Sequence, residues 1–269
     1  MAYKKDTWVF PGSIEHEFKF MGKYGAAGEK RQQRKQASKE QIQKQNQWLR
    51  EKRMRRLIKA NFCENDLWIT LKYPKGERKP IGEVKNDLKR FLDRLRYAYK
   101  KQDVPLKYIY RIEIGRRGGI HIHILINRTR GEPNADVLIQ KLWVCGRAHF
   151  ELIYQNGGYQ DLACYIVKLP DEDVEKQLSL FPESERKELI KYSCSRNLKR
   201  VEPVSKVYKH WTMRKILEEG PTPTEGYYID MDSIVSGINP ITGMSYLYYT
   251  EYPISRERGQ PPDGWEESS

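Results

Sequence analysis

The stretch GGIHIHILIN, residues 118–127, alternates histidine with isoleucine and is the stretch of sequence that decides the fold around it. Successive side chains of a β-strand leave on opposite faces of the sheet. His121 and His123 therefore share one face, while Ile120, Ile122 and Ile124 share the other and predict burial against a core. Two imidazoles side by side are half of a metal site, although the same pattern also fits a solvent-facing pair on a half-covered sheet.

A second strand pattern, KYIYRIEIG at residues 107–115, comes just before the first and is joined to it by the short basic turn RRG. If residues 116–118 form the loop, Gly115 pairs with Gly119, and Glu113 lies directly across from His121. Side chains at such cross-strand positions are about 5 Å apart. The register therefore predicts that a carboxylate and two imidazoles converge on one exposed patch.

This set of donors predicts a divalent metal site. A metal ion held by Glu113, His121 and His123 keeps open coordination positions, and Mg²⁺ or Mn²⁺ bound there could polarise a phosphodiester oxygen. If Glu113 is not the third ligand, Glu151 or His149 on the next predicted strand is the alternative.

The nucleophile that such a metal requires is found in YQDLACYIVKLP, residues 159–170, which reads as a helix ended by Pro170. Tyr165 and Lys168 are three residues apart and hence neighbours on one helical face. A tyrosine can attack phosphorus to form a phosphotyrosine, and the lysine can orient the phosphate or stabilise charge on the tyrosine. Read by itself, Tyr165 would be an ordinary aromatic at the edge of a core.

The order of periodic segments predicts the fold class. A strand over 66–73, a helix over 83–101, the hairpin, a helix over 134–143, a strand over 147–154 and the tyrosine helix follow one another. We expect an α+β fold with a central antiparallel sheet and helices packed on one face. Residues 171–188 read as a charged, variable excursion, 206–220 as a further helix, and the segments around SGINPITG at 236–243 as a C-terminal β-hairpin.

Charge divides the 269-residue chain into regions. The net charge is +13, and in residues 30–59 twelve basic side chains against Glu40 and Glu51 leave +10, which predicts a polyanionic partner. From residue 217 to the end, ten acidic side chains against Arg256 and Arg258 leave −8. We therefore expect a basic N-terminal region at 1–61, made of an irregular arm to about residue 28 and a helix over 29–61, a catalytic domain at 62–216, and an acidic, tyrosine-rich region at 217–269.

Several protein classes are excluded by composition. The four cysteines at 63, 145, 164 and 194 form no C-x-x-C pair, which favours free thiols in a reducing cytoplasm over disulfides or a structural zinc site. No apolar run approaches the roughly 20 residues of a membrane span, and the first residues lack the apolar core of a signal peptide. We expect a cytoplasmic protein of a bacterial cell or a phage-infected host, with no membrane contact.

Taken together, the strand ITLKY, the glutamate in YRIEIGRRGG, the strand HIHILIN and the helical YIVK resemble the HUH endonucleases of the rolling-circle replication initiator group. The sequence is most similar to the replication-associated proteins of phages, plasmids and integrative elements of Firmicutes, over residues 62–215. SCSRNLKRVEP at 193–203 is also similar to a segment of that family. The resemblance implies the HUH fold, metal ligation by Glu113, His121 and His123, Tyr165 as nucleophile, Lys168 as its helper, and ITLKY as a scaffold that faces DNA.

The chain departs from some members of that group. Tyr159 is six residues from Tyr165 and on another helical face, which predicts an enzyme with a single catalytic tyrosine. No G-x-x-x-x-G-K-[ST] motif occurs, so we expect unwinding by a separate helicase and synthesis by a polymerase of the host. The acidic C-terminal region has no counterpart that adds to the interpretation.

The leading hypothesis is a metal-dependent enzyme that nicks single-stranded DNA at a replication origin through a covalent 5′-phosphotyrosine and leaves a 3′ hydroxyl. A relaxase or single-tyrosine transposase uses similar chemistry. A non-catalytic nucleic-acid-binding protein or a basic structural protein of a phage particle would explain the charge alone. The side chains expected to contact DNA are Arg31, Arg34, Lys35, Arg53, Arg55, Arg56, Lys72, Arg116 and Arg117.

Overall fold

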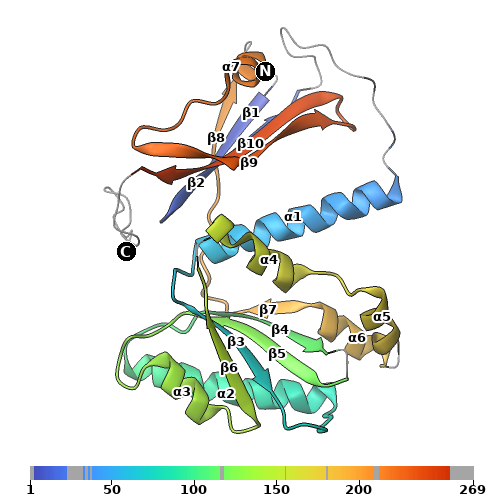
Figure 1. The fold of residues 1–269 in the computed structure, drawn as a ribbon, viewed down its shortest axis with the longest axis vertical. Helices are drawn as coiled ribbons and strands as arrows, with labels where there is room; N and C mark the ends of the chain where they lie inside the picture. The colour runs from blue at the N-terminus through green and yellow to red at the C-terminus, as the bar shows by residue number, and fades with distance from the viewer. Residues whose placement is uncertain are drawn as a thin grey trace. The chain divides into compact units, whose positions relative to one another are not determined.

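The computed structural model of the chain describes residues 3–22, 33, 36, 38–115, 118–154, 156–179, 181–208 and 212–254. The chain divides into two compact units, one formed by Gln47–Lys199 and the other by Met1–Asn46 together with Arg200–Ser269. Each unit contains a five-stranded antiparallel sheet (Figure 1). The fold is α+β, as expected, but it holds two sheets where the sequence predicted one sheet and a hairpin.

The sheet of unit 47–199 has the strand order β6-β3-β5-β4-β7, so the histidine strand β5 lies at its centre. The expected strands and helices are present in the expected order. Their bounds are α1 (Lys39–Lys59), β3 (Leu67–Lys72), α2 (Ile81–Lys101), β4 (Tyr108–Ile114), β5 (Ile120–Ile126), α3 (Ala135–Leu142), β6 (Arg147–Leu152), the 3₁₀ turn η1 (Asn156–Tyr159), α4 (Gln160–Val167), α5 (Glu172–Leu178), α6 (Glu183–Ile190) and β7 (Tyr192–Cys194).

One face of this sheet forms the main hydrophobic core with α2 and α3 (Figure 1). The alternating isoleucines of β5 and β4 lie on this face, and Ile122 and Ile124 are fully buried. Helix α2 covers them with residues at helical spacing, among them Leu88, Phe91 and Leu95. Because the period of two in the strands sends every isoleucine here, every histidine goes to the opposite face.

The opposite face is also partly covered, so the expectation of helices on one face is wrong. Met54 and Ile58 of α1 and Ile166 of α4 form a second cluster with Ile109 and Leu125 of the sheet. Those two strand residues occupy positions of the polar face, but at the other end of their strands from Glu113 and His121. The apolar end of the face binds helices α1 and α4, and the polar end holds the candidate site.

Residues 171–188 are more ordered than expected. This charged segment forms α5 and most of α6, and Leu178 and Leu189 reach the main core. The sequence pattern concealed these helices because each is short and carries only one or two apolar anchors.

The expectation of an irregular arm at residues 1–28 is wrong for residues 3–20. They form β1 (Tyr3–Phe10) and β2 (Ser13–Phe20), a hairpin in which Phe10 pairs with Ser13 around the turn Pro11–Gly12. Charged residues break the apolar alternation, and the sheet buries some of them. Asp6 is 1% exposed and forms ion pairs with Lys4 at 2.9 Å and Lys19 at 2.7 Å.

The rest of this unit combines the chain's two ends in one sheet of order β8-β1-β2-β10-β9. The expected C-terminal hairpin is present. The helix expected over 206–220 begins later, because residues 206–208 belong to a strand. The bounds are β8 (Val204–Tyr208), α7 (Thr212–Glu219), β9 (Tyr227–Asn239) and β10 (Met244–Pro253). Most of the arm and helix expected between residues 23 and 37 lies outside the described residues, and the domain boundaries at 61 and 216 stay a prediction.

Candidate active site

The polar face of β4 and β5 carries the candidate site. Glu113 pairs with His121 and Arg111 with His123, which confirms the predicted hairpin register. On the other side of β5, Thr70 of β3 pairs with His123. Three adjacent strands thus place one carboxylate, two imidazoles, one guanidinium and one hydroxyl on a common surface.

His123 is held on two sides and contacts Glu113 directly. Its Nε2 lies 3.2 Å from Oε2 of Glu113, and its Nδ1 lies 3.2 Å from Oγ1 of Thr70. The indole of Trp68 stacks on the ring with centroids 5.7 Å apart. When Nδ1 carries the proton and donates it to Thr70, Nε2 keeps a lone pair, which is the form that binds a metal ion or accepts a proton.

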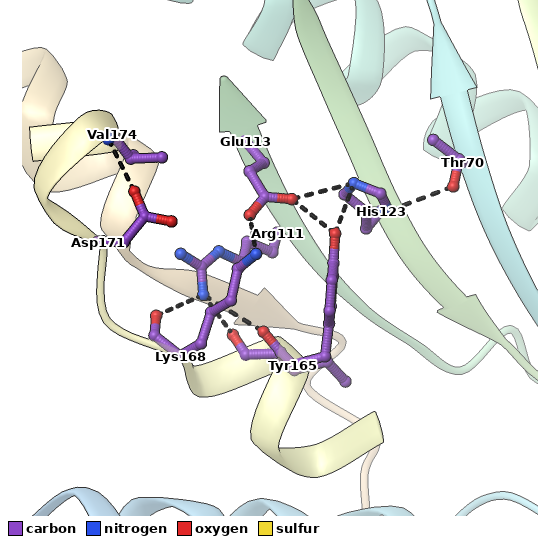
Figure 2. Close-up of polar contacts among 9 residues, drawn as sticks. Thr70, Arg111, Glu113, His123, Tyr165, Lys168, Asp171 and Val174 are labelled. Atoms are coloured by element: carbon purple, nitrogen blue, oxygen red, sulfur yellow. Dashed lines mark hydrogen bonds and ion pairs between the residues drawn. The ribbon is translucent and has the colours of Figure 1, made fainter. Parts of the chain in front are cut away.

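Tyr165 extends from α4 into this pair of side chains (Figure 2). Its hydroxyl donates a hydrogen bond of 2.7 Å to Oε2 of Glu113 and lies 3.1 Å from Nε2 of His123. Trp68 meets the phenol ring edge-on. Of the other tyrosines nearby, Tyr159 is buried in the second cluster and Tyr154 is 59% exposed. The geometry therefore favours Tyr165 as the nucleophile.

Lys168 lies just beyond α4, whose C-cap it is, and not on the helical face that the sequence suggested. Its Nζ nevertheless lies 2.7 Å from Oε1 of Glu113 and 4.5 Å from the centre of the Tyr165 ring. Glu113 thus binds Lys168 with one oxygen and Tyr165 with the other (Figure 2). The carboxylate is the centre of the cluster.

The charges of the cluster perturb its pKa values. Burial by itself raises the pKa of the Glu113 carboxyl, but the hydrogen bonds from His123, Lys168 and Tyr165 outweigh burial and hold this pKa well below its usual range. Burial and the hydrogen bond to Glu113 raise the pKa of Tyr165 well above its usual value. Burial and the nearby Lys72 lower the pKa of His121. Near neutral pH the resting site holds an ionised carboxylate and a protonated tyrosine.

The residues Arg111, Thr70 and Trp68 belong to the site but were missed by the sequence interpretation. Arg111 is 2% exposed, and its Nη1 approaches backbone carbonyls at the end of α4. A signal existed, because Arg111 alternates with Glu113 along β4, and Trp68 and Thr70 alternate along β3 on the polar face. Counting metal ligands alone did not use that signal.

The expected metal ligands converge only in part. Glu113 and His123 present Oε2 and Nε2 toward each other, and these are donors of the kind that a divalent ion uses. The His121 ring is centred 6.2 Å from that of His123 and lies beside Gly115, where an added Cβ would be 3.2 Å from its Cε1. Within the described residues, no three His, Cys, Asp or Glu side chains come together closely enough to hold a metal ion. Two of the three donors therefore fit a metal, and the third lies at their side.

The alternative third ligands, His149 and Glu151, lie farther away. Thr70 separates His149 from His123, since it pairs with both, so the two histidines stand about 10 Å apart across two strand spacings. Both alternative ligands are exposed, and they contact each other at 3.5 Å. They are not part of the Glu113 cluster.

The residues expected to contact DNA fall into three groups. Arg53 and Lys72 are exposed, and Lys72 pairs with His121 at the edge of the site. Arg55 and Arg56 are half-buried, and Arg55 donates a hydrogen bond of 2.8 Å to Gln160. The others lie outside the described residues, namely Arg31, Arg34, Lys35, Arg116 and Arg117.

Comparison with known proteins identifies the part of the chain that carries the site. Residues 66–170 match the family model of the replication-associated protein ORF2. No curated protein and no solved structure matches the chain significantly. Among the described helices, none combines the length and the apolar character that a membrane crossing requires. The matched segment contains Trp68, Glu113, His123, Tyr165 and Lys168, and it belongs to that replication-associated family.

Proposed function

We propose that this member of the replication-associated ORF2 family is an HUH-type, metal-dependent endonuclease that nicks single-stranded DNA at a replication origin. One observation carries the proposal: the Tyr165 hydroxyl lies within 3.1 Å of both Glu113 and His123, with the Lys168 ammonium against its ring. A nucleophile, candidate metal ligands and a cation meet at one point. The family match adds a role in replication to this chemistry.

The proposed reaction is a transesterification at phosphorus. The Tyr165 oxygen attacks the scissile phosphodiester, and a bond between this oxygen and phosphorus replaces the bond between phosphorus and the 3′ oxygen. The departing 3′ oxygen takes up a proton and becomes a hydroxyl that can prime synthesis. Because a phosphodiester replaces a phosphodiester, the same site can rejoin the strand by the reverse step.

Each side chain has a distinct task in this reaction. Tyr165 is protonated at rest, and its hydrogen bonds to Glu113 and His123 direct the proton away from the attacking oxygen. Lys168 stabilises negative charge on the phenolic oxygen and on the phosphate. Trp68 and Thr70 hold the His123 ring in place.

A divalent ion, Mg²⁺ or Mn²⁺, completes the proposed site. Glu113 and His123 would hold it, and His121 is the nearest further donor. When bound, the ion polarises the scissile phosphate and stabilises the charge that develops on it. A separate helicase and polymerase of the host would extend the nicked strand.

The test is a cleavage assay with the full-length chain, Mn²⁺ and single-stranded DNA from the origin of the chain's own element. We expect a covalent protein–DNA adduct on a denaturing gel that maps to Tyr165. Tyr165→Phe removes the attacking oxygen and should abolish the adduct, while DNA affinity changes by less than about twofold. Tyr154→Phe is the matched control, because Tyr154 is exposed outside the cluster, and it should react like the unmodified chain.

The outcome separates the alternatives. A non-catalytic DNA-binding protein would give no adduct with any variant. A relaxase or transposase would give the adduct on a transfer origin or on transposon ends, and not on the replication origin. An adduct that maps to Tyr154 or Tyr159 would contradict the assignment of Tyr165.

A further inference from the structure

Arg111 is a buried charged residue at the site for which the proposed reaction has no use. It lies on β4 two residues before Glu113 and on the same face of the sheet. The side chain is 2% exposed, and its neighbours in the second cluster are apolar, among them Ile109, Leu125 and Ile166. A guanidinium in such surroundings requires an explanation, because burial of a charge is costly unless hydrogen bonds compensate for it.

The compensation comes from the end of α4. Nη1 of Arg111 lies 2.7 Å from the carbonyl oxygen of Lys168, 3.2 Å from that of Ile166 and 3.4 Å from that of Tyr165 (Figure 2). The last carbonyls of a helix have no donor within the helix, and the C-terminal end of a helix attracts positive charge. A single side chain of β4 thus binds the backbone of both Tyr165 and Lys168.

We infer that Arg111 is a positioning residue that fastens the end of α4 to β4, so that Tyr165 and Lys168 meet Glu113. The inference rests on the proposed function, because it assigns Arg111 a role in that reaction. The two ends of the connection support it, since the strand that holds Arg111 also presents Glu113, and the carbonyls belong to the residues whose side chains bind Glu113. An apolar side chain could fill the same space and stabilise the fold about as well, but it could not bind these carbonyls.

The consequence for catalysis is large because attack at phosphorus depends on geometry. A displacement of about 1 Å of a catalytic group can reduce a rate about 100-fold. Loss of Arg111 should therefore lower the rate of the chemical step, while DNA binding, which depends on phosphate contacts elsewhere, stays nearly the same.

The experiment compares Arg111→Met with Asn61→Ala in the full chain. Asn61 is a matched control because its buried amide also binds a helix end, donating 2.9 Å to the carbonyl of Leu57 in α1 and 2.8 Å to that of Lys199. Both variants lose a helix-end contact, but only one loses it at Tyr165. The readouts are single-turnover cleavage at saturating DNA, KM for the same DNA, thermal stability, and amide hydrogen exchange over residues 165–168.

We expect Arg111→Met to reduce kcat about 100-fold with KM within about threefold, and to speed amide exchange at residues 165–168. Asn61→Ala should lower stability and leave kcat within about twofold. If Arg111→Met does not fold, Arg111→Lys serves instead, because it keeps the charge but reaches fewer carbonyls, and it should give a smaller loss of kcat. A folded Arg111 variant with the kcat of the unmodified chain, or a loss of kcat equal to that of Asn61→Ala, overturns the inference.

The hydrogen-exchange readout distinguishes failure of this inference from failure of the proposed function. If the unmodified chain does not cleave DNA, the proposed function fails, but faster exchange at residues 165–168 in Arg111→Met still supports the fastening of α4. If the unmodified chain cleaves and the exchange does not change in Arg111→Met, the positioning role fails and the proposed function stands.

Discussion

At the residue scale, the candidate site is organised around the carboxylate of Glu113. One oxygen accepts the Tyr165 hydroxyl and faces His123, and the other pairs with Lys168. Each partner favours the ionised form and keeps the pKa of Glu113 low, so this residue presents a negative charge throughout the physiological range. A metal ion bound at Oε2 would compete with the Tyr165 hydroxyl for the same oxygen.

This geometry ranks the predicted metal ligands. Because Glu113 and His123 already face each other at 3.2 Å while His121 lies aside, Glu113→Ala or His123→Ala should weaken Mn²⁺ binding about 100-fold or more, and His121→Ala by about tenfold. Isothermal titration with MnCl₂ measures the three affinities, with His149→Ala as a control that should bind normally. Equal losses for His121 and His123 would mean that the His121 ring turns into the site when metal binds.

Thr70 provides a second prediction at this scale. Thr70→Val keeps the shape of the side chain but removes the oxygen that lies 3.2 Å from Nδ1 of His123. The ring then loses the contact that orients it, and Mn²⁺ affinity and cleavage rate should each fall about tenfold. Thr70→Ser restores the oxygen and should recover most of both. A Thr70→Val protein with unchanged affinity would show that Trp68 alone holds the ring.

At the element scale, α1 combines two tasks along its length. Met54 and Ile58 are buried in the second cluster, whereas Arg50 and Arg53 point to solvent. Removal of residues 1–60 would therefore open the core of unit 47–199 and remove two strands of the other sheet. Any DNA-binding role of α1 has to be tested by changing exposed charges.

The prediction for α1 concerns the salt dependence of DNA binding. Each phosphate that a cation neutralises adds about 0.7 to the slope of log affinity against log salt for single strands. Arg50→Gln together with Arg53→Gln should therefore reduce that slope by about 1 and leave cleavage of a short saturating substrate unchanged. Arg90→Gln on α2, which packs on the other face of the sheet, is the control. An unchanged slope in the double variant would assign these arginines to another task.

At the scale of the whole molecule, the chain's two ends form one sheet around buried charges. Asp6 of β1 binds Lys4, Lys19 and Ser205, so that residues close to both ends depend on one carboxylate. Burial raises the pKa of Asp6, but the bonds from Lys19, Ser205 and Lys4 outweigh burial and lower it to about 2. A depressed carboxyl pKa stabilises the folded state above the unfolded value, and this contribution disappears as pH falls through the folded value.

We therefore predict a pH-dependent difference between the unmodified chain and Asp6→Asn. The unmodified chain should be more stable by about 2 kcal/mol at pH 7, and the difference should shrink between about pH 4 and pH 2 as Asp6 is protonated. Urea unfolding at several pH values measures both proteins. The comparison isolates Asp6 because the other carboxylates titrate in both. A difference that stays constant to pH 2 would contradict the assigned pKa.

The sequence by itself determined the central part of this protein. A period of two fixes which face each residue of β4 and β5 occupies, and a short turn fixes the register, so the positions of Glu113, His121 and His123 followed from local geometry. The segment with Tyr165 was likewise recognisable as a helix. Only the tertiary structure decided that Tyr165 and Lys168 contact Glu113, that Arg111 binds the end of α4, and that His121 stays aside. These contacts join residues about 50 positions apart, and their distances depend on how α4 packs on the sheet. The hairpin of β1 and β2 was hidden for the same reason, because its buried Asp6 is tolerated only with Lys19 on the neighbouring strand and Ser205 near the far end of the chain.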